Sequence, residues 1–185
     1  MPDQIGVGSP PMSLPLTIDI GCGPNKQEGA YGVDCHPFSG VDHVFDFEGS
    51  EWPLPSNHFK KVHCAHVIEH ILDTRHFLRQ IHRISVDGAE VYFETPHFSS
   101  IDSWSDPTHV LHLSSRWHQP LLSGGYLSRV VGEFQLIRRE LDFRNAFGDH
   151  LAKLAIKLFG LAAYERYYCS LFPAQNVRTW LRVKK

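Results

Sequence analysis

The chain has 185 residues, and its 42% hydrophobic content suits one domain with a core of ordinary size. The 18 basic and 20 acidic residues leave a formal net charge of -2, which excludes the overall basic field that grips a nucleic-acid backbone. Charges and prolines interrupt every apolar run well before the roughly 20 residues of a membrane span. We therefore expect neither a nucleic-acid partner nor a membrane-spanning segment.

The N-terminal segment and the cysteines favour a cytoplasmic protein. Residues 1–14 carry one charge and are broken by glycines and prolines, so we expect a flexible tail rather than a signal peptide, followed by a single domain over 15–185. The four cysteines lack the paired spacing of a zinc or redox site. A reduced protein in the cytoplasm is the simpler interpretation.

Short apolar segments then alternate with turns and helical stretches, a pattern typical of a parallel α/β sheet covered on both faces. In the first half of the chain, strands are predicted at 16–20, 31–34, 41–45 and 61–65. A helix follows, which Asp73 is expected to cap and the turn 87–88 to close, because the apolar residues between them repeat at helical spacing.

In the second half, a fifth strand is predicted at 90–95, ended by Pro96. Residues 97–119 form a polar and aromatic insertion without periodicity, which is more often a functional lid than a simple connection. A strand at 134–143 and an amphipathic helix over 151–162 follow. The last strand, 177–183, alternates in polarity and is expected to pair antiparallel at the edge of the sheet.

The first strand ends in the sequence Asp-Ile-Gly-Cys-Gly-Pro over 19–24. Two closely spaced glycines, Gly21 and Gly23, let the backbone come close to a ligand. Alone, this motif fits an ordinary tight turn equally well. Asp34, however, ends the next strand, where a carboxylate can accept hydrogen bonds from both hydroxyls of a ribose. The two features together indicate a nucleotide-type cofactor.

Two further motifs lie at predicted strand ends. Asp46 offers an acceptor for the amine of adenine and Phe47 an aromatic surface. The segment His-Val-Ile-Glu-His over 66–70 follows the fourth strand.

In order and spacing, the motifs from Thr17 to Pro96 resemble the class I S-adenosylmethionine-dependent methyltransferases, in particular a broad group of type 11-like methyltransferase domains. The resemblance implies a Rossmann-like, doubly wound α/β fold with a seven-stranded, mostly parallel sheet and an antiparallel last strand. It also implies S-adenosylmethionine as the cofactor. The resemblance also implies which residues contact each part of the cofactor. It places Asp19, Gly21, Cys22 and Gly23 near the methionine part and Asp34 on the ribose. It places Asp46 and Phe47 by the adenine and His66 near the sulfonium.

Two details refine the resemblance. Only seven residues separate Gly23 from Tyr31, so the usual first helix must be short or missing, and Lys26 becomes a candidate contact for the cofactor carboxylate. The segments 96–100 and 106–109 look like a subgroup associated with polysaccharide biosynthesis. A hydroxyl of a sugar or related small metabolite is therefore the expected acceptor.

Methylation of a hydroxyl requires a base near the methyl group, and histidine titrates in the right range. His97 is the first candidate because it follows the fifth strand directly, and His109 is the second. No metal ligand is assigned. A version in which Asp102 or Asp106 joins the two histidines around a divalent ion ranks below the metal-free route.

Other interpretations compete. A nicotinamide-dependent oxidoreductase would need a third glycine where Lys26 stands. Residues 66–70 match the inverted zinc-protease pattern, although the nucleotide-binding order around them argues for coincidence. A methyltransferase fold that has lost catalysis would keep the cofactor residues. A homodimer whose partner completes the pocket also stays open.

Overall fold

The computed structural model describes residues 14–143 and 147–185. Its strands are β1 Thr17–Ile20, β2 Tyr31–Asp34, β3 His43–Val44, β4 Phe59–Ala65, β5 Ser85–Pro96, β6 Glu133–Asp142 and β7 Asn176–Lys184. Its helices are α1 Thr74–Ile84, α2 Asp102–Ser105, α3 Ser128–Val131, α4 Phe147–Phe159 and α5 Leu161–Tyr167, with 3₁₀ turns η1 Ile68–His70 and η2 Gln119–Leu121.

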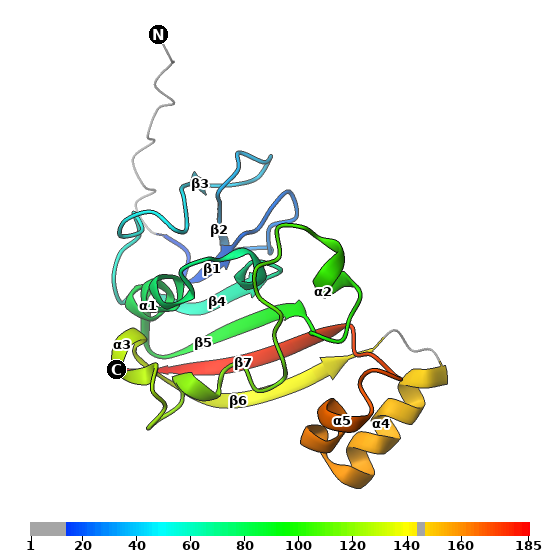
Figure 1. Ribbon diagram of the computed structural model, residues 1–185. Coiled ribbons are helices and arrows are strands. Elements are labelled where there is room, and N and C mark those ends of the chain that lie inside the picture. The colour runs from blue at the N-terminus through cyan, green and yellow to red at the C-terminus, as the bar shows by residue number, and fades with distance from the viewer. Residues whose placement is uncertain (1–13, 144–146) are drawn as a thin grey trace.

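The strands form one seven-stranded sheet in the order β3-β2-β1-β4-β5-β7-β6 (Figure 1). The pairs among β1 to β5 are parallel, and β7 is antiparallel to both of its neighbours. This arrangement confirms the predicted Rossmann-like α/β class. The connection between β1 and β2 contains no helix, as the short spacing there predicted.

Three local predictions were wrong. The last strand is not at the edge, because β7 pairs with β5 on one side and β6 on the other. Residues 87–88 do not close a helix, since α1 ends at Ile84 and its end is held by Ser85, whose hydroxyl donates to the Ile81 carbonyl at 2.7 Å. The single helix expected over 151–162 is two helices, separated at Gly160, whose φ of 85° suits glycine.

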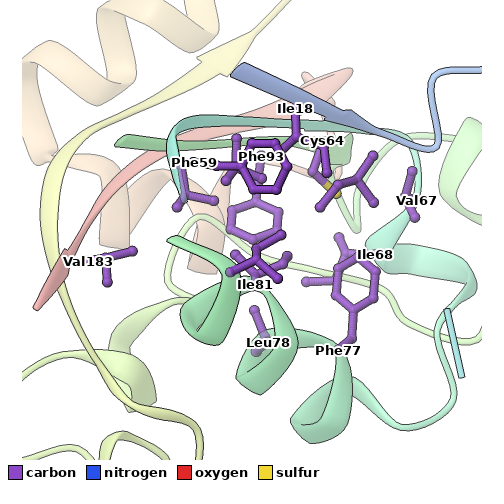
Figure 2. Packing of buried hydrophobic residues seen from close by; sticks show 14 of the residues in the cluster. Ile18, Phe59, Cys64, Val67, Ile68, Phe77, Leu78, Ile81, Phe93 and Val183 are labelled. Atoms are coloured by element: carbon purple, nitrogen blue, oxygen red, sulfur yellow. The ribbon is translucent and has the colours of Figure 1, made fainter. Parts of the chain in front are cut away.

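The main core lies between α1 and one face of the sheet. Asp73 starts α1 by accepting a hydrogen bond from the His76 amide at 3.0 Å. Figure 2 shows Phe77 and Ile81 on α1 within the same cluster as Ile18 and Phe93 of the sheet, and all four side chains are fully buried. Truncation of such a phenylalanine to alanine typically costs about 3 to 5 kcal/mol, so this face fixes the sheet that carries the strand ends.

The opposite face of the sheet is only half covered. Along β5 and β7, buried residues alternate with intermediate or exposed ones. Tyr92 stacks on His63 at a ring distance of 5.0 Å and packs on Trp180 at 4.9 Å, while the Arg138 guanidinium lies 3.9 Å above the Trp180 ring. We expected helices to cover both faces of the sheet. Among the described residues this face is instead covered by long side chains of the sheet itself.

Helices α4 and α5 lie beyond the end of β6 rather than over the sheet (Figure 1). They have a small core of their own, formed by Phe143, Ala152, Tyr164, Cys169 and Ala174. Within the part of the chain that the structure describes, no helix is long and apolar enough to span a membrane.

Segment 97–119 contains a buried histidine that gives a pH prediction. His118 is 1% exposed, and burial, together with the nearby Arg139, lowers its pKa to about 4. The unfolded chain therefore binds more protons than the folded chain between about pH 6.5 and 4. We expect the free energy of unfolding to fall by about 3 kcal/mol across that window as the pH decreases. Urea denaturation at several pH values checks this, and His118→Phe should flatten the profile; an unchanged slope in that variant would contradict the assignment.

Candidate functional site

The polar strand ends meet at one edge of the sheet. Strands β1, β2, β4 and β5 are parallel, so their carboxyl ends lie side by side, which is where open α/β sheets bind ligands. The site has two parts: the turn after β1 with the end of β2, and a cavity at the ends of β4, β5 and the start of β7.

The turn after β1 is shaped by its glycines. Gly21 and Gly23 have φ values of 68° and 52°. A Cβ atom on Gly21 would lie 2.1 Å from Val67, whereas one on Gly23 would meet nothing within 4 Å. The amides of residues 21 and 22 donate to the Val33 carbonyl, so the turn offers open space rather than free N–H groups. The missing side chain of Gly21 therefore makes room for Val67, and Gly23 borders the open space beside the turn.

Two buried carboxylates support this turn. Asp19 is 3% exposed and holds the Gln27 amide and the His63 ring, each at 2.8 Å, so both of its oxygens are used beneath the turn. Asp34 is 5% exposed and accepts from the amides of Gly23 and His36, each at 2.9 Å. Each carboxylate oxygen has a second lone pair. Asp34 thus keeps two acceptor positions beside the open glycine.

The other predicted cofactor residues differ in exposure. Asp46 is exposed and caps its own turn by accepting from the Glu48 amide at 2.9 Å. Phe47, by contrast, is 4% exposed and packs between Trp52 and Phe77. Its ring belongs to the core beside α1, so it is the backbone of Phe47 that lies beside Asp46, and its contact with adenine stays a prediction.

Cys22 and Lys26 are both occupied within the protein. Burial raises the pKa of the Cys22 thiol to about 11, so this side chain is a neutral lining group rather than a nucleophile. The Lys26 ammonium pairs with Asp42 at 2.7 Å and lies across Gly32, where an added Cβ would come within 2.3 Å of the lysine chain. Sequence reasoning did not single out Gly32, which lies within β2, or Asp42, whose carboxylate also accepts from the Gly32 amide at 2.7 Å.

The cavity has a volume of about 670 Å³. It is lined by His66, Glu69, His70, Pro96, Asp102, Ser105, Asp106, Pro107, His109, Gln175 and Asn176. Three of these residues are carboxylic acids, and no lysine or arginine is among them. The cavity can therefore form many hydrogen bonds, and its lining has no lysine or arginine to bind an anionic group.

His66 joins the two parts of the site. It follows β4 directly with a φ of 57°, and its neighbour Val67 underlies Gly21. About half of its side chain is exposed, and its Nδ1 lies 3.3 Å from a carboxylate oxygen of Glu69, which is 1% exposed. This ion pair raises the pKa of His66 above its usual value. The contact fixes the ring at the boundary between the turn and the cavity.

Segment 97–119 brings His109 into the cavity. The amides of Val110 and Leu111 donate to the Glu69 carbonyl at 2.8 and 3.1 Å, which ties this segment to η1. The His109 side chain is 8% exposed and lines the cavity beside Asp106. The second predicted base therefore lies where an acceptor could reach it.

His97 does not line the cavity. It is fully buried, with Nδ1 at 2.7 Å from the Ser99 hydroxyl and Nε2 at 3.2 Å from the carboxylate of Glu165 on α5. Both ring nitrogens therefore have partners inside the protein. The geometry opposes the prediction that His97 is the base, because the strand end turns its side chain toward α5 instead of the ligand side.

The comparisons with known proteins agree with this arrangement. A family model described as a methyltransferase domain matches residues 16–182. The chain belongs to this family. The search of curated proteins found no match.

Solved structures support the same fold at low sequence identity. A SAM-dependent methyltransferase from Archaeoglobus fulgidus is 18% identical, with a TM-score of 0.62 over 90% of this chain and 85% of that one. A putative methyltransferase in complex with the Trm112 activator, from Haloferax volcanii, is 16% identical, with a TM-score of 0.58 over 91% and 82%. Phosphoethanolamine N-methyltransferase 2 of Haemonchus contortus is 18% identical, with a TM-score of 0.53 over 95% and 50%.

This methyltransferase uses S-adenosylmethionine. The family match therefore excludes the alternative interpretation as a nicotinamide-dependent oxidoreductase. The open side of Gly23 and the spare acceptor positions of Asp34 suit such a cofactor. When bound, it supplies a methyl group made electrophilic by its sulfonium. Sequence reasoning had not assigned Glu69, Asn176 or Gln175 to the methyltransferase site; only Glu69 carried a signal, through the segment 66–70.

Proposed function

We propose that this methyltransferase transfers the methyl group to a hydroxyl of a small, uncharged, polar acceptor, such as a sugar or a related metabolite. The observation that carries the proposal is the lining of the cavity. Carboxylates, imidazoles and the side-chain amides of Gln175 and Asn176 surround it, and lysine and arginine are missing from the lining residues. Hydroxyl groups pair well with such a lining, whereas an anionic acceptor would meet like charges.

The cofactor would lie across the ends of β1, β2 and β4. We assign its methionine part to the turn formed by Asp19, Gly21, Cys22 and Gly23, its ribose to Asp34 and its adenine to Asp46 with the backbone of Phe47. The buried carboxylate of Asp34 beside the open side of Gly23 supports this assignment. His66 then lies between the sulfonium and the acceptor.

In the transfer, a bond forms from the acceptor oxygen to the methyl carbon while the bond from that carbon to sulfur breaks, leaving a neutral thioether. The acceptor proton must pass to a base. We assign this role to His66, because its half-exposed ring lines the cavity at the boundary with the turn, with Nδ1 beside Glu69. His109 remains the reserve. Segment 97–119 acts as the lid that helps to exclude water, a role supported by the five cavity residues that it supplies: Asp102, Ser105, Asp106, Pro107 and His109.

Charge argues against one related acceptor class. The Haemonchus contortus enzyme was solved with phosphomonomethylethanolamine, which carries a phosphate. No lysine or arginine is among the residues that line this cavity to hold a phosphate by charge-assisted pairs, so we expect phosphorylated amines to be poorer acceptors than neutral hydroxyl compounds. Membership of the polysaccharide-biosynthesis subgroup, a cytoplasmic location and a homodimer stay predictions.

Two measurements test the function. Calorimetric titration with S-adenosylmethionine, S-adenosylhomocysteine and NAD should show binding of the first two only. Incubation with methyl-labelled cofactor and a panel of neutral sugars, polyols, amines and phosphate esters should label the neutral hydroxyl compounds. Cofactor binding without labelling of any compound would favour the noncatalytic alternative, and labelling of phosphate esters alone would overturn the proposed acceptor class.

Replacing His66 should separate catalysis from cofactor binding. Asparagine is the suitable replacement, because it tolerates the left-handed backbone at this position. We expect His66→Asn to lower kcat about 100-fold, as loss of a general base does, with the cofactor Kd changed less than about threefold. The exposed His150, mutated to alanine, is the control. A normal kcat in His66→Asn would exclude the role.

A further inference from the structure

Glu69 poses a physical problem that the methyl transfer alone does not resolve. Its side chain is 1% exposed, and neither carboxylate oxygen accepts a hydrogen bond from any residue that the structure describes. The His66 contact at 3.3 Å reaches only Oε1 and lacks hydrogen-bond geometry. A buried carboxylate normally needs partners for both oxygens, because desolvation of the charge is costly. Glu69 lines the cavity, so a positively charged ligand there could supply what is missing.

His70 lies next to Glu69 with a defined tautomer. The Thr108 hydroxyl donates to Asp106 at 2.6 Å, so its oxygen is left to accept from the Nδ1–H of His70 at 2.9 Å. A neutral imidazole that donates from Nδ1 carries its lone pair on Nε2. His70 therefore offers Nε2 as a ligand atom.

His109 has the same tautomer for a different reason. Its Nδ1 lies 3.1 Å from the carbonyl oxygen of Ser103, which can only accept, so Nδ1 carries the proton. The lone pair is again on Nε2. A backbone carbonyl that fixes a histidine ring in this way is the usual support of a metal-binding histidine.

The three side chains converge. One ligand atom each from Glu69, His70 and His109 lies within 4.8 Å of the others, and the two imidazole rings are 4.7 Å apart. Bonds of about 2.0 to 2.2 Å would place ligand atoms roughly 3.4 Å apart around a tetrahedral ion, so side-chain adjustments of about an ångström would close the site. Two imidazoles and one carboxylate are the set that divalent transition metals prefer.

We propose that Glu69, His70 and His109 bind a divalent transition-metal ion, such as Zn²⁺, at the wall of the cavity. Three protein ligands leave at least one position of the ion open toward the cavity. Its role rests on the proposed function: an acceptor hydroxyl bound at the open position becomes more acidic and passes its proton to His66. The site itself rests only on the three side chains. It differs from the inverted zinc-protease pattern in 66–70, because His109 replaces His66 as a ligand.

A second group of metal-binding side chains provides the comparison. Asp34, Cys35 and His36 also place ligand atoms within 4.8 Å, but Cys35 and His36 are exposed, and both Asp34 oxygens already accept backbone hydrogen bonds. This group coincides with the expected ribose position. An ion bound there would compete with the cofactor, whereas an ion at Glu69 would not.

The test is calorimetric titration of chelator-treated protein with Zn²⁺, with Co²⁺ absorption as a second readout of the ligand set. We expect one site in the natural protein. Glu69→Gln and, independently, His109→Ala should each weaken binding by about 100-fold or more, because loss of a ligand exceeds the 10- to 100-fold effect of losing its support. His36→Ala is the matched control and should retain the site. Three results would overturn the proposal: Glu69→Gln still binds Zn²⁺, His36→Ala loses Zn²⁺ binding, or the natural protein binds no Zn²⁺.

Thr108 should act as a positioning residue. Thr108→Val removes the acceptor for the His70 Nδ1–H and should weaken Zn²⁺ binding about 10-fold, while Thr108→Ser should restore it. Parallel titration of the natural protein with S-adenosylmethionine separates the two proposals. Cofactor binding without Zn²⁺ binding rejects the metal site and keeps the methyltransferase function, and the reverse result rejects the cofactor assignment alone.

Discussion

Replacing Asp34 by alanine should weaken S-adenosylmethionine binding about 1,000-fold. If both ribose hydroxyls donate to this carboxylate, two charge-assisted hydrogen bonds of about 2 kcal/mol each are lost, and 4 kcal/mol corresponds to roughly three decades in Kd. The carboxylate also accepts from the Gly23 amide at 2.9 Å, so its removal loosens the turn as well. Calorimetric titration of the variant with the cofactor measures the effect.

Two further variants make the Asp34 experiment specific. Asp34→Asn keeps one carbonyl oxygen and the side-chain shape, so we expect an intermediate loss of about 30-fold. Asp87→Asn changes a carboxylate at the opposite end of β5, where it accepts from the Lys185 amide at 3.0 Å, and should leave Kd unchanged. If folded Asp34→Ala protein binds the cofactor with wild-type affinity, the assignment of the ribose to the end of β2 is wrong, and so is the proposed orientation of the cofactor.

The succession of strands in the first half of the chain was predictable because it follows from local features, whereas the order of the strands in the sheet was not predicted. Residues 31–34 end in Asp34, residues 61–65 are followed directly by His66, and the spacing after Gly23 leaves no room for a helix. The position of β7 was not predictable from its own sequence. Alternating polarity indicates that one face of a strand is buried, but it does not indicate whether the strand pairs with a neighbour along one edge or along both.

The cofactor half of the site was also predictable in outline. Asp19, Gly21, Gly23 and Asp34 follow strand ends, and parallel strands bring those ends together. The direction of the Phe47 ring was not predictable, because a strand end says nothing about side-chain direction, and the ring turns into the core.

The acceptor half escaped prediction for a tertiary reason. Glu69 and His109 are 40 residues apart, and they meet because the amides of Val110 and Leu111 bind the Glu69 carbonyl. No periodicity in segment 97–119 encodes that contact. The same lack of pattern left His97 ranked ahead of His109 as the base, although His97 is enclosed and His109 lines the cavity.

The contrast between these two histidines gives the second large effect. Replacing His97 by alanine should lower the free energy of unfolding by about 3 to 5 kcal/mol, because a fully buried ring is lost and the buried Glu165 carboxylate loses one of its partners, keeping the Ser115 amide at 2.7 Å. Burial alone would raise the pKa of Glu165, but hydrogen bonds from His97 and Ser115 outweigh it and lower the pKa overall. The stability that Glu165 contributes is therefore present above its unfolded pKa and is lost as the pH falls through the folded pKa.

Urea denaturation of three variants decides between a structural and a catalytic His97. His112→Ala is the matched control, since His112 belongs to the same segment but is exposed and stacks on Trp104, so we expect a loss of only about 1 kcal/mol. In the double variant His97→Ala/Glu165→Gln, part of the lost stability should return, because the unpaired charge is gone. If His97→Ala instead keeps its stability within about 1 kcal/mol and loses methyl transfer, the ring must reach the acceptor in a conformation that opens toward the cavity, and the general base is His97 rather than His66.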